Sequence, residues 1–363
     1  MTSAVLRVKI YGAGSIGNHL ANASRALGWD VTVCDVDDRA LQRMKNEIYP
    51  SRYGRWDESI KLANNKAAPT GGFDLILIGT PPPYHISLAL EALKERPRGI
   101  MIEKPLCGPD LENVSDLLDR AGEGGAKIFV GYTHVVGKSL KKTEELLSSG
   151  KIGKIKTLDV EFREHWEGIF KAHPWLSGPQ DSYLGYWKSG GGASGEHSHA
   201  INLWQHFSHF LGFGRVTDVL ASVSYVKEGK ADYDDLCLLH VRTEGGLLGR
   251  VVQDVVTTPS RKWARIQGAT GAIEWHANYN SDGDAVILLQ PGASPEIFAM
   301  PKKRPDDFIE ELRHIEMSLP ENAAASPLAL ERGLDTMRVV AAAHVSERNR
   351  TAVKIDYSVG KKK

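Results

Sequence analysis

The sequence has few cysteines, no net charge and no long apolar run. Its three cysteines, Cys34, Cys107 and Cys237, lie far apart, and no two have the spacing of a metal site. A small, odd number of cysteines argues against a disulfide framework, so we expect a reducing, cytoplasmic compartment. The first residues contain no secretory apolar core and no apolar stretch reaches the length of a membrane span, so no membrane partner is expected.

The absence of net charge argues against one broad class of partner. Lysines and arginines number 45, and aspartates and glutamates also number 45. A general nucleic-acid binder needs a basic surface that neutralises phosphates, so we expect no nucleic-acid partner. With 363 residues, the chain is long enough for two domains that each bury a core.

The first third of the chain alternates short apolar runs with helical patterns. Such alternation is typical of strands joined by right-handed crossovers, and it predicts an α/β fold with a doubly wound parallel sheet, the Rossmann arrangement. Arg7 and Lys9 are unusual in the first of these strands, because a central parallel strand is normally apolar. The expected strands are 5–12, 31–36, 73–80, 99–105 and 127–132.

The pattern changes after this first third. A helix at 138–150 and a strand at 156–164 precede a helix at about 193–211, and several β-like runs then follow without intervening helices. Consecutive strands of this kind predict a mostly antiparallel sheet. We therefore expect two domains, 1–132 and 133–363, of which the second is of the α+β type.

A glycine-rich turn, GAGSIG, follows the first expected strand and opens a helix. This is the context that a dinucleotide-binding G-x-G-x-x-G motif requires. The first glycine permits a tight turn, the second lets the backbone approach a pyrophosphate, and the third allows close packing of helix on strand. The cofactor contacts expected from this turn are Gly12, Gly14, Ser15, Ile16 and Gly17.

An acidic residue at the end of the second strand indicates which dinucleotide is bound. Asp35 stands at this position, and further acids rather than basic residues follow it. Its carboxylate can hold the ribose hydroxyls and would repel a 2′-phosphate. The expected cofactor is therefore NAD rather than NADP.

Prolines and polar residues follow two later strands, in TPPPYH and EKPL. Ligands of open parallel sheets lie beyond the carboxyl ends of the strands. We therefore expect these residues to line the nicotinamide side of the site: Thr80, Pro81, Pro82, His85, Glu103 and Lys104.

Five motifs in this order resemble one known family. GAGSIG, TPPPYH, EKPL, SSGKIGKIKTLDVEF and YWKSGGG before a histidine-bearing helix are similar to the glucose–fructose oxidoreductase, inositol dehydrogenase and rhizopine-catabolism (Gfo/Idh/MocA) family. The resemblance implies a nicotinamide-dependent oxidoreductase of a sugar, polyol or sugar derivative. By position it makes Lys104 a catalytic-site lysine and His199 the catalytic histidine. It also implies that the second sheet packs against another subunit, in a homodimer or homotetramer.

The stretch SGGGASGEHSHAIN carries the expected proton chemistry. Alcohol oxidation needs a group that takes the hydroxyl proton, and histidine suits this role near neutral pH, while Lys104 can donate a hydrogen bond to the reacting oxygen. On one continuous helix, Glu196, His199 and Asn202 would share a face. Glu196 would then orient His199 or favour its protonated form, and Asn202 would reach the substrate. The family usually has an aspartate three or four residues before the histidine, where this sequence has Gly195 and Glu196, so the role of Glu196 is open.

A metal site is a competing interpretation of the same stretch. Glu196 and His199 have E-x-x-H spacing, and His206 and His209 follow on the same expected helix. A zinc or di-metal site needs further convergent ligands, and no second matching motif is present. We therefore expect no metal.

An aromatic-rich segment at 165–189 is the expected specificity region. Aromatic rings stack on the apolar faces of sugars, and a neighbouring lysine can contact an anionic or hydroxyl group. The same rings can instead pin a long loop to the core, and both interpretations stay open. The expected substrate contacts are Trp175, Tyr186, Trp187 and Lys188.

Two other functions fit the same motifs. An enzyme with tightly held NAD can hydrolyse a glycoside by oxidising and then reducing the same sugar. A dinucleotide-binding regulator needs no turnover at all. The fold does not separate these functions from a dehydrogenase, and only the reaction does.

Overall fold

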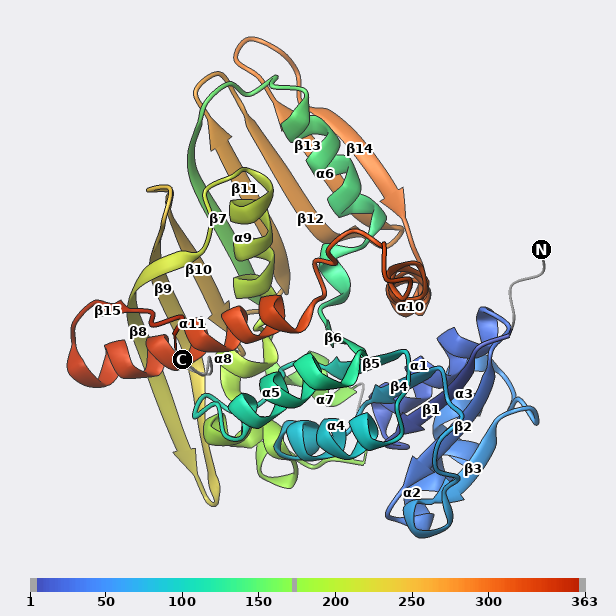
Figure 1. Cartoon of the computed structure of the whole chain (residues 1–363). Helices are drawn as coiled ribbons and strands as arrows, with labels where there is room; N and C mark the ends of the chain where they lie inside the picture. The colour runs from blue at the N-terminus through green and yellow to red at the C-terminus, as the bar shows by residue number, and fades with distance from the viewer. Residues whose placement is uncertain (1–4, 172–174, 359–363) are drawn as a thin grey trace.

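The strands form two sheets, one from the first third of the chain and one from the remainder (Figure 1). The structure is a computed structural model that describes residues 5–171 and 175–358. Helix α11 (Leu330–Asn349) contacts strands of both sheets and so ties the two halves together.

The first sheet has six parallel strands in the order β3-β2-β1-β4-β5-β6. This is the doubly wound Rossmann order, which reverses direction between β1 and β4. The five expected strands are confirmed; the sixth, β3, is a short, half-exposed edge strand that the sequence did not predict. The strands are β1 (Arg7–Tyr11), β2 (Asp30–Asp35), β3 (Lys61–Asn64), β4 (Leu75–Ile78), β5 (Gly99–Glu103) and β6 (Lys127–Gly131).

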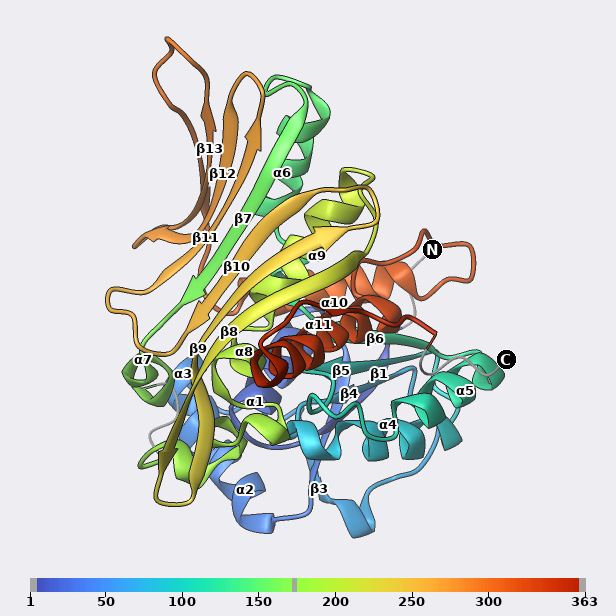
Figure 2. The same ribbon diagram turned by 90° about the vertical axis from the view of Figure 1, so that its left-hand side faces the viewer.

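Helices cover both faces of this sheet. Figure 2 shows α1 on one side, where it packs against α10, and α4 with α5 on the other. A π-helical turn at Met44–Ile48 joins α2 to α3. The helices of this part are α1 (Ser15–Ala26), α2 (Asp38–Arg43), α3 (Tyr49–Tyr53), α4 (His85–Lys94) and α5 (Val114–Gly124).

The charged residue in the central strand β1 has a specific partner. Lys9 is only 1% exposed, and its Nζ lies 2.7 Å from both carboxylate oxygens of Glu95, the residue that caps the C-terminus of α4. The hydroxyl of Tyr11 and the backbone N–H of Gly71 also donate to Glu95. A buried lysine is tolerated here because its charge is paired and hydrogen-bonded.

The second sheet has nine strands in the order β14-β13-β12-β11-β7-β10-β9-β8-β15. All neighbours are antiparallel except β7 and β10, so the expected mostly antiparallel sheet is confirmed. The sequence did not predict the two edge strands, β14 and β15. The strands are β7 (Ile155–Arg163), β8 (Val216–Glu228), β9 (Ala231–Thr243), β10 (Leu248–Asp254), β11 (Arg261–Gly268), β12 (Ala272–Asn280), β13 (Gly283–Leu289), β14 (Glu296–Pro301) and β15 (Val353–Lys354).

The inner face of the second sheet carries helices, and the outer face is open. Helix α6 packs on β12 and β13, and α9 packs on β7 and β10. Figure 2 looks onto the outer face, which no described helix covers along most of its length. The helices of this part, besides α11, are α6 (Lys138–Ser148), α7 (Trp166–Lys171), α8 (Gly192–Glu196), α9 (His199–Phe210) and α10 (Asp306–Ser318).

The continuous helix expected at 193–211 is wrong, because the chain breaks into α8 and α9. Ser198 N–H donates to the Gly195 carbonyl and Ala200 N–H donates to the His197 carbonyl, so the chain tightens to three-residue hydrogen bonds at the junction. This tightening rotates α9 relative to α8. The three residues do not act as one set: Asn202 hydrogen-bonds to Thr336 of α11, whereas Glu196 hydrogen-bonds to Lys104, whose charge acts on His199.

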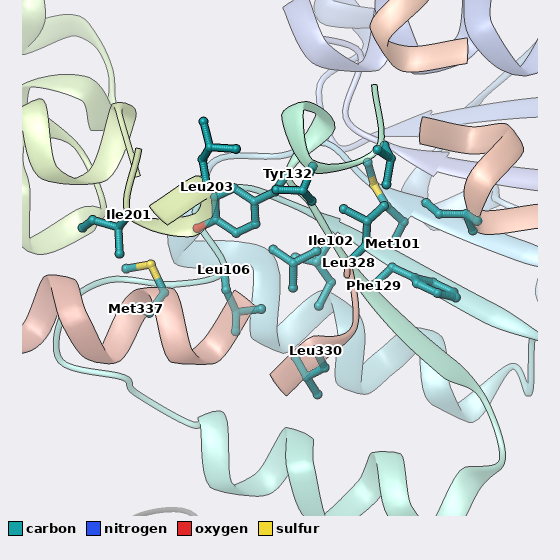
Figure 3. Packing of buried hydrophobic residues seen from close by; sticks show 14 of the residues in the cluster. Met101, Ile102, Leu106, Phe129, Tyr132, Ile201, Leu203, Leu328, Leu330 and Met337 are labelled. Carbon is teal, nitrogen blue, oxygen red and sulfur yellow. The ribbon is translucent and has the colours of Figure 1, made fainter. Parts of the chain in front are cut away.

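One hydrophobic core runs between the two sheets. Figure 3 shows Met101 and Phe129 of the first sheet in the same cluster as Leu203 of α9 and Met337 of α11. The first sheet ends with β6, just before the expected boundary at 132/133. The later segment nevertheless returns to it, since the N–H of Val130 donates to the carbonyl of Leu328 at 2.7 Å. No helix in the described ranges is long and apolar enough to cross a membrane.

Candidate active site

The glycine turn has the geometry that a bound pyrophosphate requires. Gly12 has φ +101°, and a Cβ on it would lie 2.8 Å from the carbonyl oxygen of Gly79. A Cβ on Gly17 would lie 1.8 Å from the carbonyl oxygen of Gly12, so only glycine allows this approach of helix to strand. A Cβ on Gly14 would meet no atom within 4 Å, which leaves open space beside the turn.

The N-terminus of α1 adds positive potential to this space. The helix begins at Ser15, no side chain caps its first turn, and that turn contains no acid. Arg52, on α3, donates to the Ser15 hydroxyl at 2.8 Å and to the Ser15 carbonyl at 2.9 Å. Free helix N–H groups and a guanidinium beside them favour an anion. Nothing in the sequence marks Arg52 as a neighbour of the glycine turn, because it lies 37 positions beyond Ser15.

Asp35 is fixed at the end of β2, beside the glycine turn. Its Oδ2 accepts from the N–H of Ala13 at 2.8 Å, and its Oδ1 accepts from the N–H of Asp37 at 2.9 Å. These bonds hold the carboxylate next to the turn, at the place where a Rossmann sheet holds a ribose. The residues present therefore fit NAD.

The TPPPYH and EKPL turns are joined by His85. Its ring nitrogens lie 2.7 Å from the Thr80 carbonyl oxygen and 2.9 Å from the Pro105 carbonyl oxygen, and the side chain is fully buried. Burial lowers the pKa of His85 to about 4. His85 was expected to line the nicotinamide, but its burial restricts it to holding the two turns together. Pro82 is also buried, against Gly190, whereas Pro81 is exposed.

Lys104 and Glu196 meet where the first sheet faces α8. The Nζ of Lys104 donates to Oε2 of Glu196 at 3.0 Å and to the backbone carbonyl of Glu196, also at 3.0 Å. Both side chains are mostly buried. Tyr183 also hydrogen-bonds to Glu196, and burial followed by the Glu196 charge raises the pKa of this tyrosine. Glu196 is thus the acid that faces the lysine, while Gly195 packs against the Gly190 carbonyl.

His199 lies beside this pair among aromatic rings. Its ring contacts His134 at a centroid distance of 4.8 Å and Tyr132 at 5.4 Å. Burial, and then the charges of His134 and Lys104, hold the pKa of His199 well below its usual 6.5. Its Nδ1 is buried and has no hydrogen-bond partner among the described residues. A neutral imidazole with a free nitrogen is suited to accept a proton.

Tyr132 and His134 were missed by the sequence reading. They directly follow β6, so the rule that sites lie beyond the carboxyl ends of parallel strands would have found them. The Tyr132 hydroxyl donates to the hydroxyl of Ser198, which steadies the junction between α8 and α9.

Glu103 is buried behind Lys104. Burial raises the pKa of Glu103 to about 7, and the Lys104 charge opposes that shift. Its Oε2 accepts from the Lys104 N–H at 3.2 Å, and its Oε1 has no partner among the described residues. Its position supports the backbone that carries the lysine.

Neighbours of His199 in the sequence point elsewhere. His197 is buried, and its ring hydrogen-bonds to backbone groups of Glu164 and Asp254. It therefore points away from the direction of His199, as expected for a residue two positions earlier. Asn202 is also buried, and its Nδ2 donates to the Thr336 hydroxyl at 3.1 Å. Asn202 was expected to touch substrate, but the break before α9 turns it towards α11.

The aromatic segment packs in three directions. The Trp187 ring stacks on His344 of α11 at 4.4 Å, and the Tyr186 hydroxyl donates to the Gln180 carbonyl. Trp175 lies under the guanidinium of Arg43 on α2, 5.8 Å away. Lys188 is exposed. These contacts show that Trp187 anchors its loop, and they leave the substrate contacts of the segment as predictions.

No group of three or more histidines, cysteines, aspartates or glutamates that could hold a metal occurs within 5–171 and 175–358. His206 bonds to Glu144 instead, with Nε2 and Oε1 2.8 Å apart. In the same ranges all three cysteines are buried and free.

Solved structures with the same fold cover nearly the whole chain. Levoglucosan dehydrogenase in complex with NADH aligns with a TM-score of 0.77 and 17% identity, covering 97% of this chain and 99% of that one. An oxidoreductase from Agrobacterium radiobacter, in complex with NAD+, L-tartaric acid and magnesium, gives 0.74 and 19%, covering 96% and 98%. The WlbA dehydrogenase from Bordetella pertussis, with NADH and UDP-GlcNAcA, gives 0.71 and 19%, covering 97% and 99%. At sequence identities of 17–19%, this structural similarity establishes the fold of the chain.

Family models identify both parts of the chain. Residues 6–132 match the oxidoreductase family with an NAD-binding Rossmann fold, and residues 140–274 match the GFO/IDH/MocA C-terminal domain. A search of curated protein sequences found no match. The two family models follow each other in order over most of the chain, so this chain belongs to the GFO/IDH/MocA family of NAD-binding oxidoreductases.

Proposed function

We propose that this enzyme transfers a hydride between NAD and a secondary alcohol or ketone of a sugar, polyol or sugar derivative. The observation that carries the proposal is the 3.0 Å contact between the ammonium group of Lys104 and Glu196, since the charge of this lysine also acts on the buried imidazole of His199. A positioned cation and a neutral base are the two groups that alcohol oxidation needs besides a hydride acceptor.

Each side chain has a distinct role in this proposal. Lys104 donates a hydrogen bond to the reacting oxygen and stabilises negative charge on it. Glu196 holds the ammonium group in position. His199 is neutral near pH 7 because its pKa is low, so it can accept the hydroxyl proton during oxidation and return it during reduction. Bound NAD supplies the hydride acceptor.

The cofactor would be held along the carboxyl ends of β1, β2 and β4. The pyrophosphate would lie over the open space at Gly14, and Asp35 would face the ribose hydroxyls. The carboxylate of Asp35 disfavours the 2′-phosphate of NADP. The contacts proposed here are Gly12, Gly14, Ser15, Ile16, Gly17, Asp35, Thr80, Pro81 and Lys104.

Two relatives of the same fold support a sugar-type substrate. One is named levoglucosan dehydrogenase, and the other was solved with UDP-GlcNAcA. The partly buried Tyr183 and Tyr186 lie in the loop that reaches Glu196, where rings can stack on a sugar. We also propose a cytoplasmic location, which the free cysteines support, and a homodimer or homotetramer, which the open sheet face supports.

The test is a screen of sugars, polyols and nucleotide-activated sugars with NAD and with NADP, read by absorbance of the reduced cofactor. We expect turnover with NAD, and kcat falling about 100- to 10,000-fold in His199→Gln. Lys94→Gln, at an exposed position on α4, is the control and should keep full activity. A strong NADP preference would contradict the role of Asp35, and glycoside cleavage without net NADH would replace the dehydrogenase by a hydrolase.

A further inference from the structure

A second cavity lies behind the candidate active site, between α6, α9, α10 and the start of α11. Its volume is about 390 Å³, which is within the range of small-molecule pockets. Helix α9 begins at the active site with His199 and lines this cavity from the next turn onward, with Asn202, His206 and His209 among the lining residues. Lys104, Glu196 and His199 do not line it.

The walls of this cavity carry an excess of positive charge. Lys141 and Arg332 line it, and burial lowers the pKa of Arg332 while the nearby Asp335 carboxylate opposes that shift. Asp335 is already bound by the Nε of Arg215 and by Arg338, each at 2.9 Å. Asp335 is therefore shared among three guanidinium groups, and the Glu331 carboxylate acts more weakly on Arg332. An anion in the cavity would relieve that imbalance at Arg332.

The cavity also contains unused hydrogen-bonding atoms. Asn202 is only 4% exposed, and its Oδ1 has no partner among the described residues. The Nε2 of His209 is likewise buried and without a described partner. The single carboxylate in the lining, Glu144, is already bonded to His206. A hydroxyl donor suits the free acceptor at Asn202, just as an anion suits Arg332.

We propose that this cavity is a binding site for a small polyhydroxylated anion, a sugar phosphate or a sugar acid. Arg332 and Lys141 bind the phosphate or carboxylate group, and Asn202 accepts a hydrogen bond from a hydroxyl of the same molecule. The site is separate from the proposed hydride-transfer site and does not depend on it. In this proposal Asn202 contacts a ligand in the cavity, whereas the sequence predicted that it would contact the substrate in the active site.

The experiment is titration calorimetry of the intact protein with saturating NAD, using glucose 6-phosphate, gluconate and glucose as probes. We expect saturable binding of at least one of the two anions, at one site per chain, and at least about tenfold weaker binding of glucose. The tighter of the two anions identifies the charged group that the site prefers.

Variants locate the binding. Arg332→Gln should weaken the anion at least about tenfold, because it removes a charge-assisted hydrogen bond. Arg348→Gln, an exposed position on the same helix, is the matched control and should leave the affinity unchanged. Lys141→Gln, at the exposed rim, should also weaken binding, and it tests the site even if Arg332→Gln fails to fold.

Two outcomes would overturn the proposal. One is the absence of saturable binding of either anion up to about 10 mM. The other is equal anion affinity in the wild type, Arg332→Gln and Lys141→Gln, which would place the anion in the hydride-transfer site or elsewhere. Neither outcome bears on turnover with NAD, so the proposed function stands or fails by its own screen.

Discussion

The ammonium group of Lys104 is held 3.0 Å from the carboxylate of Glu196, a residue 92 positions further along the chain. The pair joins the end of β5 to α8, and so it connects the cofactor-binding sheet with the part of the chain that carries His199. Because Glu196 contacts Lys104 through both its side chain and its backbone, we propose that its role is to position the lysine.

Replacing Glu196 tests this role directly. Glu196→Ala leaves Lys104 without its carboxylate, so we expect kcat to fall about tenfold or more, while the Kd for NAD changes less than about twofold. Glu196→Asp keeps the charge on a shorter side chain and should recover part of the loss. Steady-state kinetics and a fluorescence titration with NAD make the comparison. Glu58→Ala, whose side chain is 80% exposed, is the control. Equal losses of NAD affinity and kcat would contradict a positioning role.

The low pKa of His199 predicts a pH profile. Alcohol oxidation needs the neutral imidazole, and protonation removes it as pH falls through the pKa. Since burial, His134 and Lys104 lower that pKa, the acid limb of kcat/KM for oxidation should lie below pH 6.5. In His199→Gln, the residual kcat/KM should no longer show this fall at low pH. A limb at or above pH 6.5 would show that another group titrates or that His199 is not the base.

The pair between Lys9 and Glu95 makes a prediction about stability. Lys9→Met leaves the mostly buried Glu95 carboxylate without its cation, so we expect the free energy of unfolding to fall by about 3 kcal/mol. The double variant Lys9→Met/Glu95→Met removes both charges and should be more stable than the single variant. Urea unfolding, followed by circular dichroism, measures both. A double variant less stable than Lys9→Met would mean that the Glu95 contacts to Tyr11 and Gly71 outweigh the unpaired charge.

Local patterns were enough to predict five of the six strands of the first sheet and its glycine turn. Gly17 is constrained by the Gly12 carbonyl only five residues away, so the spacing of the turn carries that part of its geometry. Lys9 could not be placed in the same way, because its partner Glu95 lies 86 positions away. The charge of Lys9 was unusual for a central strand, but the carboxylate of Glu95 compensates it in the folded structure.

The part of the site around Glu196 and His199 was predicted less well, again because its contacts are with residues far away in the sequence. Nothing in GEHSHAIN marks a helix break, since it contains no proline, and His197 hydrogen-bonds at the ends of β7 and β10, with residues that lie far from it in the sequence. The sequence therefore predicted roles for Glu196 and His199 but paired Glu196 with His199, whereas its carboxylate hydrogen-bonds to Lys104. His85 was identified as a site residue but not as the buried link between two turns, because burial depends on both turns being in place.

The open face of the second sheet predicts a homo-oligomer. Leu220 on β8 and Leu248 on β10 point outward from this face and are 45% and 48% exposed. We propose that these leucines lie in a contact between subunits, because the sheet face that carries them has no described helix over most of its length. We expect size-exclusion chromatography with light scattering to give a multiple of the chain mass for the wild type, and a single-chain mass for Leu220→Glu/Leu248→Glu. Met317→Glu on α10, where the methionine is 70% exposed, should leave the assembly intact. A wild-type monomer, or a double variant of unchanged mass, would show that this face is not the contact.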